Sequence, residues 1–188
     1  MHTHVHLGIS LGLALLTLAA GAAAERPSET SARLMAQAHA AVDDGRLSDA
    51  RDLWMAVWKV DRSQVAACNL GALSYRLGEA PAAVRWLSLC KELMRAPRTA
   101  RERELYESRL ADLARARQLV GELRVVAPAG AAVTIDGEPV ELEGGAPVPV
   151  LPGRHVVRAS SNGRTAVAEV EVARGKTREV TPFVRRVR

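Results

Sequence analysis

The sequence predicts an α+β fold in two parts, α-helical hairpin repeats followed by a small antiparallel β-sandwich. Apolar residues recur at helical spacing from about Ser31 to Val120. From Gly121 onward the pattern changes to short β-branched runs punctuated by Gly and Pro. The chain of 188 residues is 48% hydrophobic and 25% charged, which is typical of a globular protein with room for two small domains.

The amino terminus resembles an export signal. Leu7 to Ala24 form an uncharged run of eighteen residues, rich in Leu at first and in Ala at the end. A membrane span needs about 20 apolar residues with anchoring flanks, whereas a signal peptide has a shorter apolar centre followed by small residues. We therefore expect residues 1–24 to be a signal peptide, cleaved before Glu25. The mature chain is expected in the periplasm or cell envelope, without a transmembrane span.

The helical part, expected over residues 25–120, contains an internal repeat with an offset of 33 residues. In each copy a helical pattern runs to a Gly, a short turn follows, and a second helical pattern begins. Gly45 and Gly78 suit these turns because Gly adopts positive φ without a Cβ clash. Small residues would let the helices of each pair approach closely. They are Ala38 and Ala50 in the first copy, and Gly71 and Ala83 in the second.

Local signals mark where helices start. Ser63 is a suitable N-cap, and Pro81 stands where a first-turn proline is tolerated. Thr99 and Glu102 form a capping box for a third helical pattern. The apolar residues of that pattern share one stripe, and they are Tyr106, Leu110 and Leu113. Since its other face is polar, this helix is expected to cap the repeat stack.

These residues resemble a tetratricopeptide repeat array from about Ser31 to Val120. The second copy matches through Leu70, Gly71, Gly78, Ala83 and Leu87, and the first through Ala38, Gly45, Ala50 and Trp54. The repeat is one residue shorter than is usual in that family. The resemblance implies a concave groove that holds a peptide or protein. The positions that match this groove are His39, Val42, Asp43, Tyr75 and Arg76.

The mature chain contains two cysteines, Cys68 and Cys90. They lie 10 and 12 residues from Gly78, so two antiparallel helices would bring them to nearly the same level. A structural disulfide is the leading interpretation for an exported chain, and two buried free thiols are the alternative. The sequence has neither a C-x-x-C motif nor a zinc-ligand spacing, so we expect no metal site.

Seven β-branched runs fall within residues 121–188 and predict the sandwich. Asp136-Gly137 lies between two apolar runs and predicts a hairpin turn, which requires positive φ. Pro152-Gly153 and Asn162-Gly163 mark two further reversals. Residues 166–172 alternate between apolar and polar side chains, so one face of that strand can be buried and the other exposed.

This second part resembles the bacterial PEGA-type domain, a small β-sandwich named for a four-residue signature. The signature here is Pro128-Ala129-Gly130-Ala131, and the motifs VTIDG at 133–137 and LPGRH at 151–155 follow in the family's order. The residues that carry the match are Pro128, Gly130, Ala131, Asp136, Gly137, Pro152 and Gly153. The resemblance implies a non-catalytic module associated with the cell envelope.

Catalysis is not expected. The mature chain has only His39 and His155 as side chains that titrate near neutral pH, and it has no G-x-S-x-G, G-x-G-x-x-G or GK[ST] motif. We therefore expect no catalytic residue, no cofactor and no small-molecule substrate. Aromatic residues make up only 3% of the chain, which leaves few stacking surfaces for nucleic acid, so no nucleic-acid partner is expected.

The formal charge of +5 favours acidic partners. Six cations lie between Arg174 and Arg188 and form a basic tail. The leading function is a non-catalytic interaction adaptor, in which the helical groove binds a protein or peptide and the sandwich docks to an envelope component. The alternative is a module that binds an acidic wall polymer or polysaccharide, with the helices as a spacer.

Overall fold

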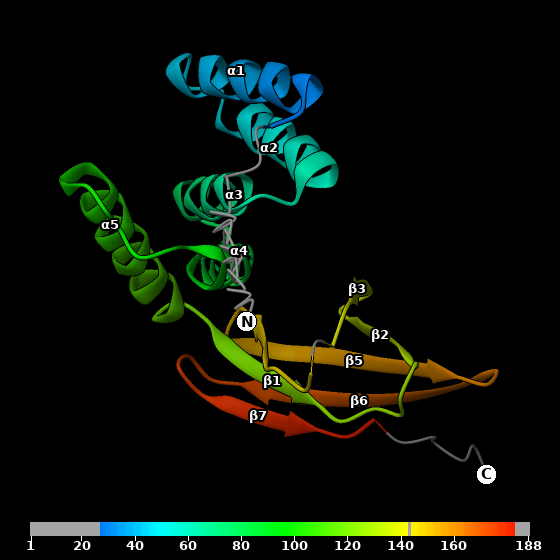
Figure 1. Cartoon of the computed structure of the whole chain (residues 1–188). Helices are drawn as coiled ribbons and strands as arrows, with labels where there is room; N and C mark the ends of the chain where they lie inside the picture. The colour runs from blue at the N-terminus through cyan, green and yellow to red at the C-terminus, as the bar shows by residue number, and fades with distance from the viewer. Residues whose placement is uncertain (1–26, 143, 183–188) are drawn as a thin grey trace, which may run out of the picture.

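The computed structural model describes residues 27–142 and 144–182. Within these ranges five helices precede seven strands in two sheets, which confirms the α+β fold in two parts (Figure 1). The helices are α1 (Glu29–Asp43), α2 (Leu47–Asp61), α3 (Gln64–Arg76), α4 (Ala80–Leu93) and α5 (Ala100–Arg117). The strands are β1 (Gly121–Val125), β2 (Ala132–Ile135), β3 (Glu138–Val140), β4 (Val148–Val150), β5 (Gly153–Ser161), β6 (Arg164–Val172) and β7 (Thr177–Val180). The expected signal peptide over residues 1–24 and the last arginines of the basic tail lie outside the described residues.

The helices form two hairpins, α1 with α2 and α3 with α4, whose turns share one geometry. Gly45 has a φ of +74° and Gly78 a φ of +77°. The Gly45 N–H donates to the Val42 carbonyl at 3.0 Å, and the Arg46 N–H donates to the Ala41 carbonyl at 2.8 Å. The turn at Gly78 repeats both bonds. They satisfy carbonyls at the helix end in a backbone conformation that Gly adopts without strain, which confirms both predicted turn glycines.

Small residues bring the helices of each hairpin together, as the sequence predicts. Ala38, Ala50 and Ala83 have no exposed surface. A Cβ atom at position 71 would lie 2.6 Å from Leu87 Cγ and 2.9 Å from the Leu87 backbone nitrogen. Gly71 is therefore needed for the close approach of α3 and α4, because the packed interior has no room for a methyl group there.

The predicted helix starts are also confirmed. Ser63 Oγ accepts a hydrogen bond from the Ala66 N–H at 3.3 Å, and Pro81 lies in the first turn of α4. At the start of α5, Thr99 Oγ1 accepts from the Glu102 N–H at 3.1 Å, and Glu102 Oε2 accepts from the Thr99 N–H at 3.3 Å. Both halves of the capping box are thus formed.

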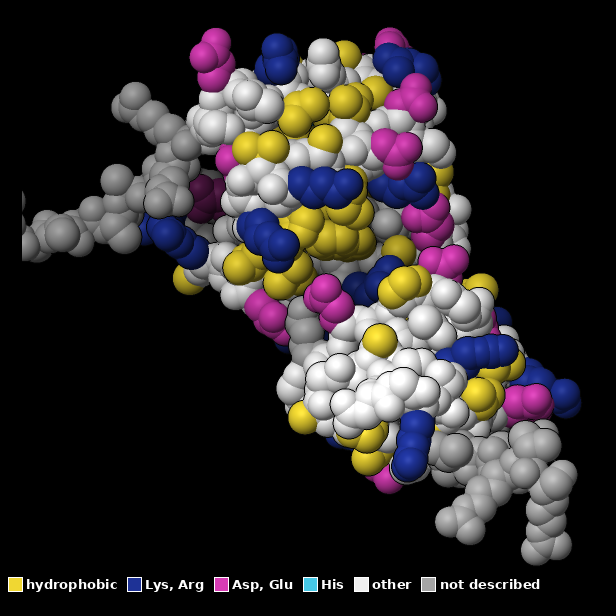
Figure 2. Space-filling view, turned by 90° about the vertical axis from the view of Figure 1, so that its right-hand side faces the viewer, with side chains coloured by type: hydrophobic (Ala, Val, Ile, Leu, Met, Phe, Trp, Pro, Cys, Tyr) yellow, Lys and Arg dark blue, Asp and Glu magenta, His cyan; other side chains and the backbone are white. Residues whose placement is uncertain are grey.

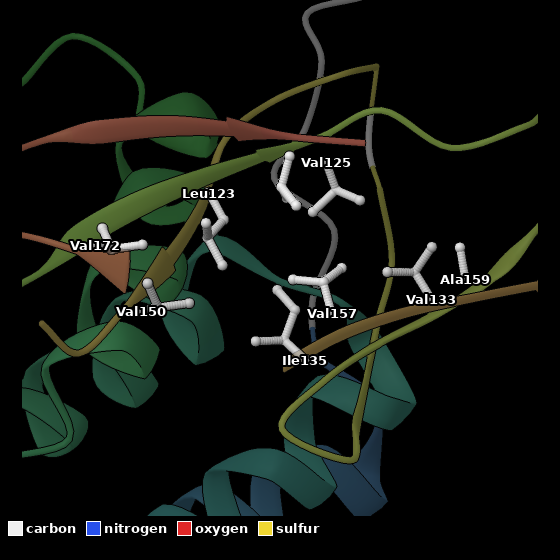
Figure 3. Packing of buried hydrophobic residues seen from close by; sticks show 9 residues of the cluster. Leu123, Val125, Val133, Ile135, Val150, Val157, Ala159 and Val172 are labelled. Atoms are coloured by element: carbon white, nitrogen blue, oxygen red, sulfur yellow. The ribbon is translucent and has the colours of Figure 1, made fainter. Parts of the chain in front are cut away.

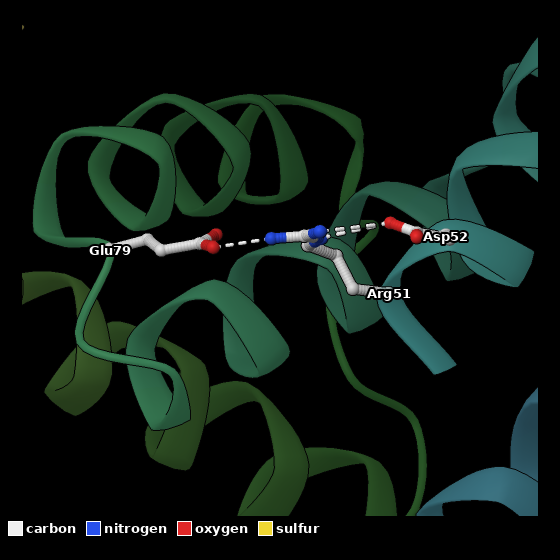
Figure 4. A network of polar contacts seen from close by, with 3 residues as sticks. All are labelled: Arg51, Asp52 and Glu79. Carbon is white, nitrogen blue, oxygen red and sulfur yellow. Dashed lines mark hydrogen bonds and ion pairs between the residues drawn. The ribbon is translucent and has the colours of Figure 1, made fainter. Parts of the chain in front are cut away.

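An ion pair joins the two hairpins. Arg51 of α2 lies between Asp52 on its own helix and Glu79 at the start of α4 (Figure 4). Two of its guanidinium nitrogens donate to Asp52 at 2.9 and 3.1 Å, and the third contacts Glu79. Since 31% of the Arg51 side chain and 37% of the Glu79 side chain stay exposed, we expect the pair to contribute about 0–1 kcal/mol and mainly to fix orientation.

A disulfide ties α3 to α4. The Cys68 and Cys90 sulfur atoms lie 2.06 Å apart, so the bridge, rather than two free thiols, is present in the structure. Cys90 has no exposed surface and Cys68 is 9% exposed. The rings of Trp58 and Trp86 pack beside the bridge, edge to face, with their centroids 5.3 Å apart.

The seven strands coincide with the seven predicted runs. They form two sheets with the orders β4-β1-β7 and β3-β2-β5-β6, and the core of the sandwich lies between them (Figure 3). Leu123 of β1 and Val157 of β5 have no exposed surface and face each other's sheets within this core. Along β6 exposed residues alternate with less exposed ones, which confirms the predicted alternation.

One strand pair departs from the expected antiparallel arrangement, because β1 and β7 run parallel. Strand β7 follows a turn after β6 and starts beside the point where the chain enters β1 from α5. The Gly175 N–H donates to the Val120 carbonyl at 2.7 Å, and the Glu122 N–H donates to the Lys176 carbonyl at 2.9 Å. Both strands therefore begin at the same end of the sheet, which makes them parallel.

The predicted hairpin turns are confirmed by their backbone angles. Asp136 and Gly137 have φ of +55° and +91° and join β2 to β3, while Asn162 and Gly163 have φ of +50° and +70° and join β5 to β6. Positive φ at both central residues is the signature of the turn whose twist matches that of paired strands. At the third predicted reversal, Gly153 has a φ of +140° where the chain leaves β4 for the other sheet.

The helical stack and the sandwich are in direct contact. Only residues 118–120 separate α5 from β1, and Val120 is buried in the cluster that contains Leu87 of α4 and Leu113 of α5. Helix α4 also contacts β4. A side chain at Gly121 would collide with Val172 of β6, so the entry into the first strand is tightly packed. Among the helices of the described ranges, none combines the length and the apolar character needed to cross a membrane.

Candidate functional site

The cleft between α3 and α5 is the candidate site. Helix α4 ends at Leu93, Met94 after it is extended, and a connection that contains Pro97 leads to α5. The second half of α5 packs on α4 through Leu113 and Ala116, whereas Leu105 in its first half is 51% exposed. The first half of α5 thus stands away from the stack (Figure 1). The space that remains, which we call the α3–α5 cleft, has a volume of about 540 Å³.

The α3–α5 cleft combines an apolar surface with positive charge. Its apolar lining comes from the first turn of α3, from the connection and from α5, and consists chiefly of Val65, Met94, Leu105 and Tyr106. Its charged and titratable lining consists of His39, Arg95, Arg98, Glu102 and Arg109. The lining residues thus include three arginines and one carboxylate.

Glu102 is already engaged within the protein. Its Oε2 atom accepts from the Arg98 N–H at 2.7 Å and from the Thr99 N–H at 3.3 Å, as part of the capping box. A carboxylate in this position balances the positive end of the α5 helix dipole. The arginine side chains of the α3–α5 cleft therefore dominate the charge that the cleft presents to a ligand.

Arg109 is the most enclosed of these cations. Its side chain is 23% exposed. Burial lowers the pKa of Arg109, although the nearby negative charge of Asp112 acts to raise it. The distance from Arg109 Nη1 to Asp112 Oδ2 is 3.7 Å, while Arg115 Nη2 lies only 2.7 Å from the other oxygen of the same carboxylate. The shorter contact assigns Asp112 mainly to Arg115, which leaves the Arg109 charge poorly compensated in a partly dehydrated place.

Of the five groove positions inferred from the resemblance, the structure brings only His39 into the α3–α5 cleft. Its ring also packs edge-on against Trp54, with the ring centroids 5.2 Å apart. Val42 packs against the core of the first hairpin, and Tyr75 packs against the second helical cluster. Asp43 and Arg76 are exposed at the carboxyl ends of α1 and α3. Contact of these residues with a partner stays a prediction.

Sequence reasoning missed the α3–α5 cleft itself. Two signals were present in the chain. Val65 is a large apolar residue in the first turn of α3, and it is 48% exposed. Pro97 interrupts the helical pattern between α4 and α5, and Arg95 and Arg98 flank it. A proline-containing connection of this kind cannot continue the preceding helix and changes the direction of the chain.

The sandwich has its own polar cluster, built from two motifs of the family resemblance. His155 Nδ1 lies 2.6 Å from Asp136 Oδ2, and His155 Nε2 lies 2.7 Å from the Leu151 carbonyl. The Val156 N–H donates to Asp136 Oδ1 at 2.8 Å. His155 is only 7% exposed, so these bonds tie the β2–β3 turn to the start of β5. Partial burial raises the pKa of Asp136, but the bonds from Val156 and His155 outweigh it and lower the pKa below 3.8.

The signature residues 128–131 form a separate turn ahead of β2. Gly130 has a φ of +74°, and the Ala131 N–H donates to the Pro128 carbonyl at 3.0 Å. The turn is exposed, and Gly130 has open space around its α-carbon. Its role is therefore to reverse the chain between the two sheets. Within the described ranges, no three His, Cys, Asp or Glu side chains are grouped so that they could hold a metal ion.

The outer face of the β5–β6 pair carries charges of both signs. Arg154 lies opposite Glu171, Val156 opposite Glu169, and Arg158 opposite Val167. Cross-strand neighbours of opposite charge offset each other. Figure 2, which views the molecule from the side turned away from α5, likewise shows Lys and Arg side chains spread over the surface rather than gathered in one patch. The described part of the sandwich thus offers a mixed surface to a polyanion.

Comparison with models of protein families, with curated proteins and with solved structures found no match. The two-part α+β fold accordingly rests on the structure, and the two family resemblances rest on the motif residues alone.

Proposed function

We propose that this chain is an exported, non-catalytic adaptor whose helical part binds a protein segment in the α3–α5 cleft. The observation that carries the proposal is the cleft itself, an apolar surface bordered by arginines at the place where α5 leaves the stack. The signal-like residues 1–24 and the Cys68–Cys90 disulfide support a location outside the reducing cytoplasm. The resemblance to tetratricopeptide repeats supports the choice of a peptide or protein as the partner.

An extended segment fits the cleft better than a small molecule does. Small-molecule sites usually enclose most of their ligand and are lined mainly by apolar groups. Here Val65 and Leu105 remain 48% and 51% exposed, so a ligand that covers them would keep one side in solvent. A peptide chain suits such a surface, because one set of its side chains can pack on the protein while the other stays hydrated.

The sandwich would act as the part that docks to an envelope component. This proposal follows from the PEGA-type resemblance. The tight packing at Val120 and Gly121 supports the proposal, because this packing would hold the cleft in a fixed direction relative to a docked sandwich. The alternative of a polymer-binding module has weaker support. An acidic polymer that bound this face of the sandwich would be repelled by the carboxylates of Glu169 and Glu171 on the outer face of β6.

The experiment compares two substitutions in the mature chain, residues 25–188. Val65 and Val60 are both 48% exposed, but only Val65 lines the α3–α5 cleft. Each is changed to Asp, and both variants are used with the unchanged protein to capture partners from an envelope extract of the source cells. We expect one or more proteins to be retained by the unchanged chain and by Val60→Asp, and to be lost with Val65→Asp.

Equal retention of the same proteins by all three forms would contradict the proposed site. Retention of wall polymer alone, unaffected by either substitution, would place the function in the sandwich and overturn the adaptor proposal. Thermal unfolding of each variant serves as the control for folding. An Asp in the first turn of α3 is favoured by the helix dipole, so Val65→Asp is expected to fold.

A further inference from the structure

We infer that the segment bound in the α3–α5 cleft is acidic, with a carboxylate paired to Arg109 and a neighbouring apolar side chain on Val65 and Leu105. This inference rests on the proposed function and adds the chemistry of the partner. It follows from three features of the cleft, namely its charge, the surroundings of Arg109, and the placement of the exposed apolar residues.

The charge of the α3–α5 cleft is the first feature. Arg95, Arg98 and Arg109 contribute three permanent positive charges, and Glu102 is the one carboxylate among the described lining residues. Glu102 is held by two backbone N–H groups at the start of α5. A basic ligand would meet repulsion from three guanidinium groups, whereas an acidic ligand would gain at each of them.

The state of Arg109 is the second feature and singles out one contact. Its side chain is 23% exposed, and the Asp112 carboxylate that lies 3.7 Å away makes its closer contact, of 2.7 Å, with Arg115. Burial lowers the pKa of Arg109, and the charge of Asp112 opposes this effect only in part. A carboxylate from a ligand would supply further compensation of this charge. Hydrogen bonds between ions are stronger in such partly dehydrated places than on the open surface.

The apolar side chains are the third feature and set the pattern of the segment. Val65 on α3 and Leu105 on α5 border the same cleft as Arg109, and Tyr106 lies next to Leu105 on the chain. Large exposed apolar side chains in a cleft with a polar rim are typical of recognition surfaces. The cleft could therefore bind an acidic side chain and an apolar side chain from the same face of an extended peptide at the same time. A simple polyanion has no apolar side chain to make the second contact.

The experiment is a selection from a library of random peptides displayed on phage, with the mature chain, residues 25–188, as the immobilised target. We expect the enriched peptides to contain Asp or Glu beside a large apolar residue. Enrichment of peptides without an acidic bias would overturn the acidic partner and leave the proposed function standing. No enrichment in the unchanged chain would contradict binding of a peptide segment altogether.

A synthetic peptide from the enriched pool then serves as the probe for single substitutions. Arg109→Gln is expected to weaken its binding by about tenfold or more, because a charge-assisted contact is lost, and Arg109→Lys is expected to weaken it less. Arg103→Gln is the matched control, since Arg103 is an exposed arginine of the same helix that does not line the cleft. Equal affinities for Arg109→Gln and Arg103→Gln would overturn the contact with Arg109.

Two further arms separate the possible sources of the signal. The peptide with its acidic residues changed to Asn or Gln should bind far more weakly, and binding of the acidic form should fall as the salt concentration rises. Dextran sulfate, which carries charge without apolar side chains, should compete poorly. If it competes as well as the peptide itself, the cleft is a general polyanion site and the inferred segment recognition is wrong.

Discussion

Reduction of the Cys68–Cys90 disulfide should destabilise the helical part by an amount that the loop length sets. The bridge closes a loop with a sequence separation of 22 residues between α3 and α4. In the chain-entropy treatment of crosslinks, a loop of this size stabilises the folded state by about 3 kcal/mol, because the crosslink restricts the unfolded chain. The bridge also packs against Trp58 and Trp86, so its opening loosens a buried contact.

The assay is thermal unfolding of the mature protein with and without a reductant. For the mature chain, residues 25–188, unfolding as one cooperative unit, about 3 kcal/mol corresponds to a decrease in Tm of about 6–12 °C. The double variant Cys68→Ala/Cys90→Ala is the control, since the reductant should leave its Tm unchanged. Two titratable thiols in the denatured, unreduced protein, together with a Tm that does not respond to the reductant, would contradict a stabilising bridge between Cys68 and Cys90.

Three further predictions test local features. Gly71→Ala should lower the free energy of unfolding by about 1–3 kcal/mol in urea titration, since its methyl group would collide with Leu87, and an unchanged midpoint would contradict that packing. Because hydrogen bonds hold the pKa of Asp136 below 3.8 in the folded protein, its stabilising contribution is complete above about pH 5 and is lost as the pH falls through the folded pKa. The difference in Tm between the unchanged protein and Asp136→Asn should therefore shrink below about pH 4, and a constant difference would argue against the hydrogen bonds from Val156 and His155 to Asp136. Thr99→Ala should destabilise the start of α5 by about 0.5–2 kcal/mol, seen as faster amide hydrogen exchange there, and unaltered exchange would count against the capping box.

Local signals predicted most of the secondary structure. The turns at Gly45 and Gly78, the capping box at Thr99 and the hairpin at Asp136 each depend on a few adjacent residues, so a linear pattern can reveal them. The repeat offset likewise predicted that Ala83 is buried. For the turns and the capping box the physical cause lies within a few adjacent residues, and for Ala83 it lies in the repeated helical hairpin.

Features that depend on distant contacts could not be predicted in this way. The parallel pairing of β1 with β7 arises because residues 173–176 return to the place where the chain leaves α5. Nothing in either strand's own sequence encodes that meeting. Similarly, the pairing of Asp136 with His155 joins two motifs that the sequence shows only as separate turns and strand starts.

The candidate site was the hardest feature to predict. Family resemblance pointed to the middle and carboxyl ends of the first helices, including Tyr75, but Tyr75 packs in a helical cluster beside the guanidinium of Arg115. The α3–α5 cleft depends instead on the direction that the chain takes after Pro97. That direction results from the packing of Leu113 on α4, which is a property of the assembled stack.

Site-specific photo-crosslinking in living cells tests directly whether a partner protein occupies the α3–α5 cleft. A photoreactive benzoylphenylalanine replaces Val65, which lines the α3–α5 cleft, or Val60, which is equally exposed outside it. We expect a discrete crosslinked protein from position 65 and none from position 60. Crosslinks to the same protein from both positions, or no crosslink from position 65 in cells that contain the folded protein, would contradict a partner bound in the cleft.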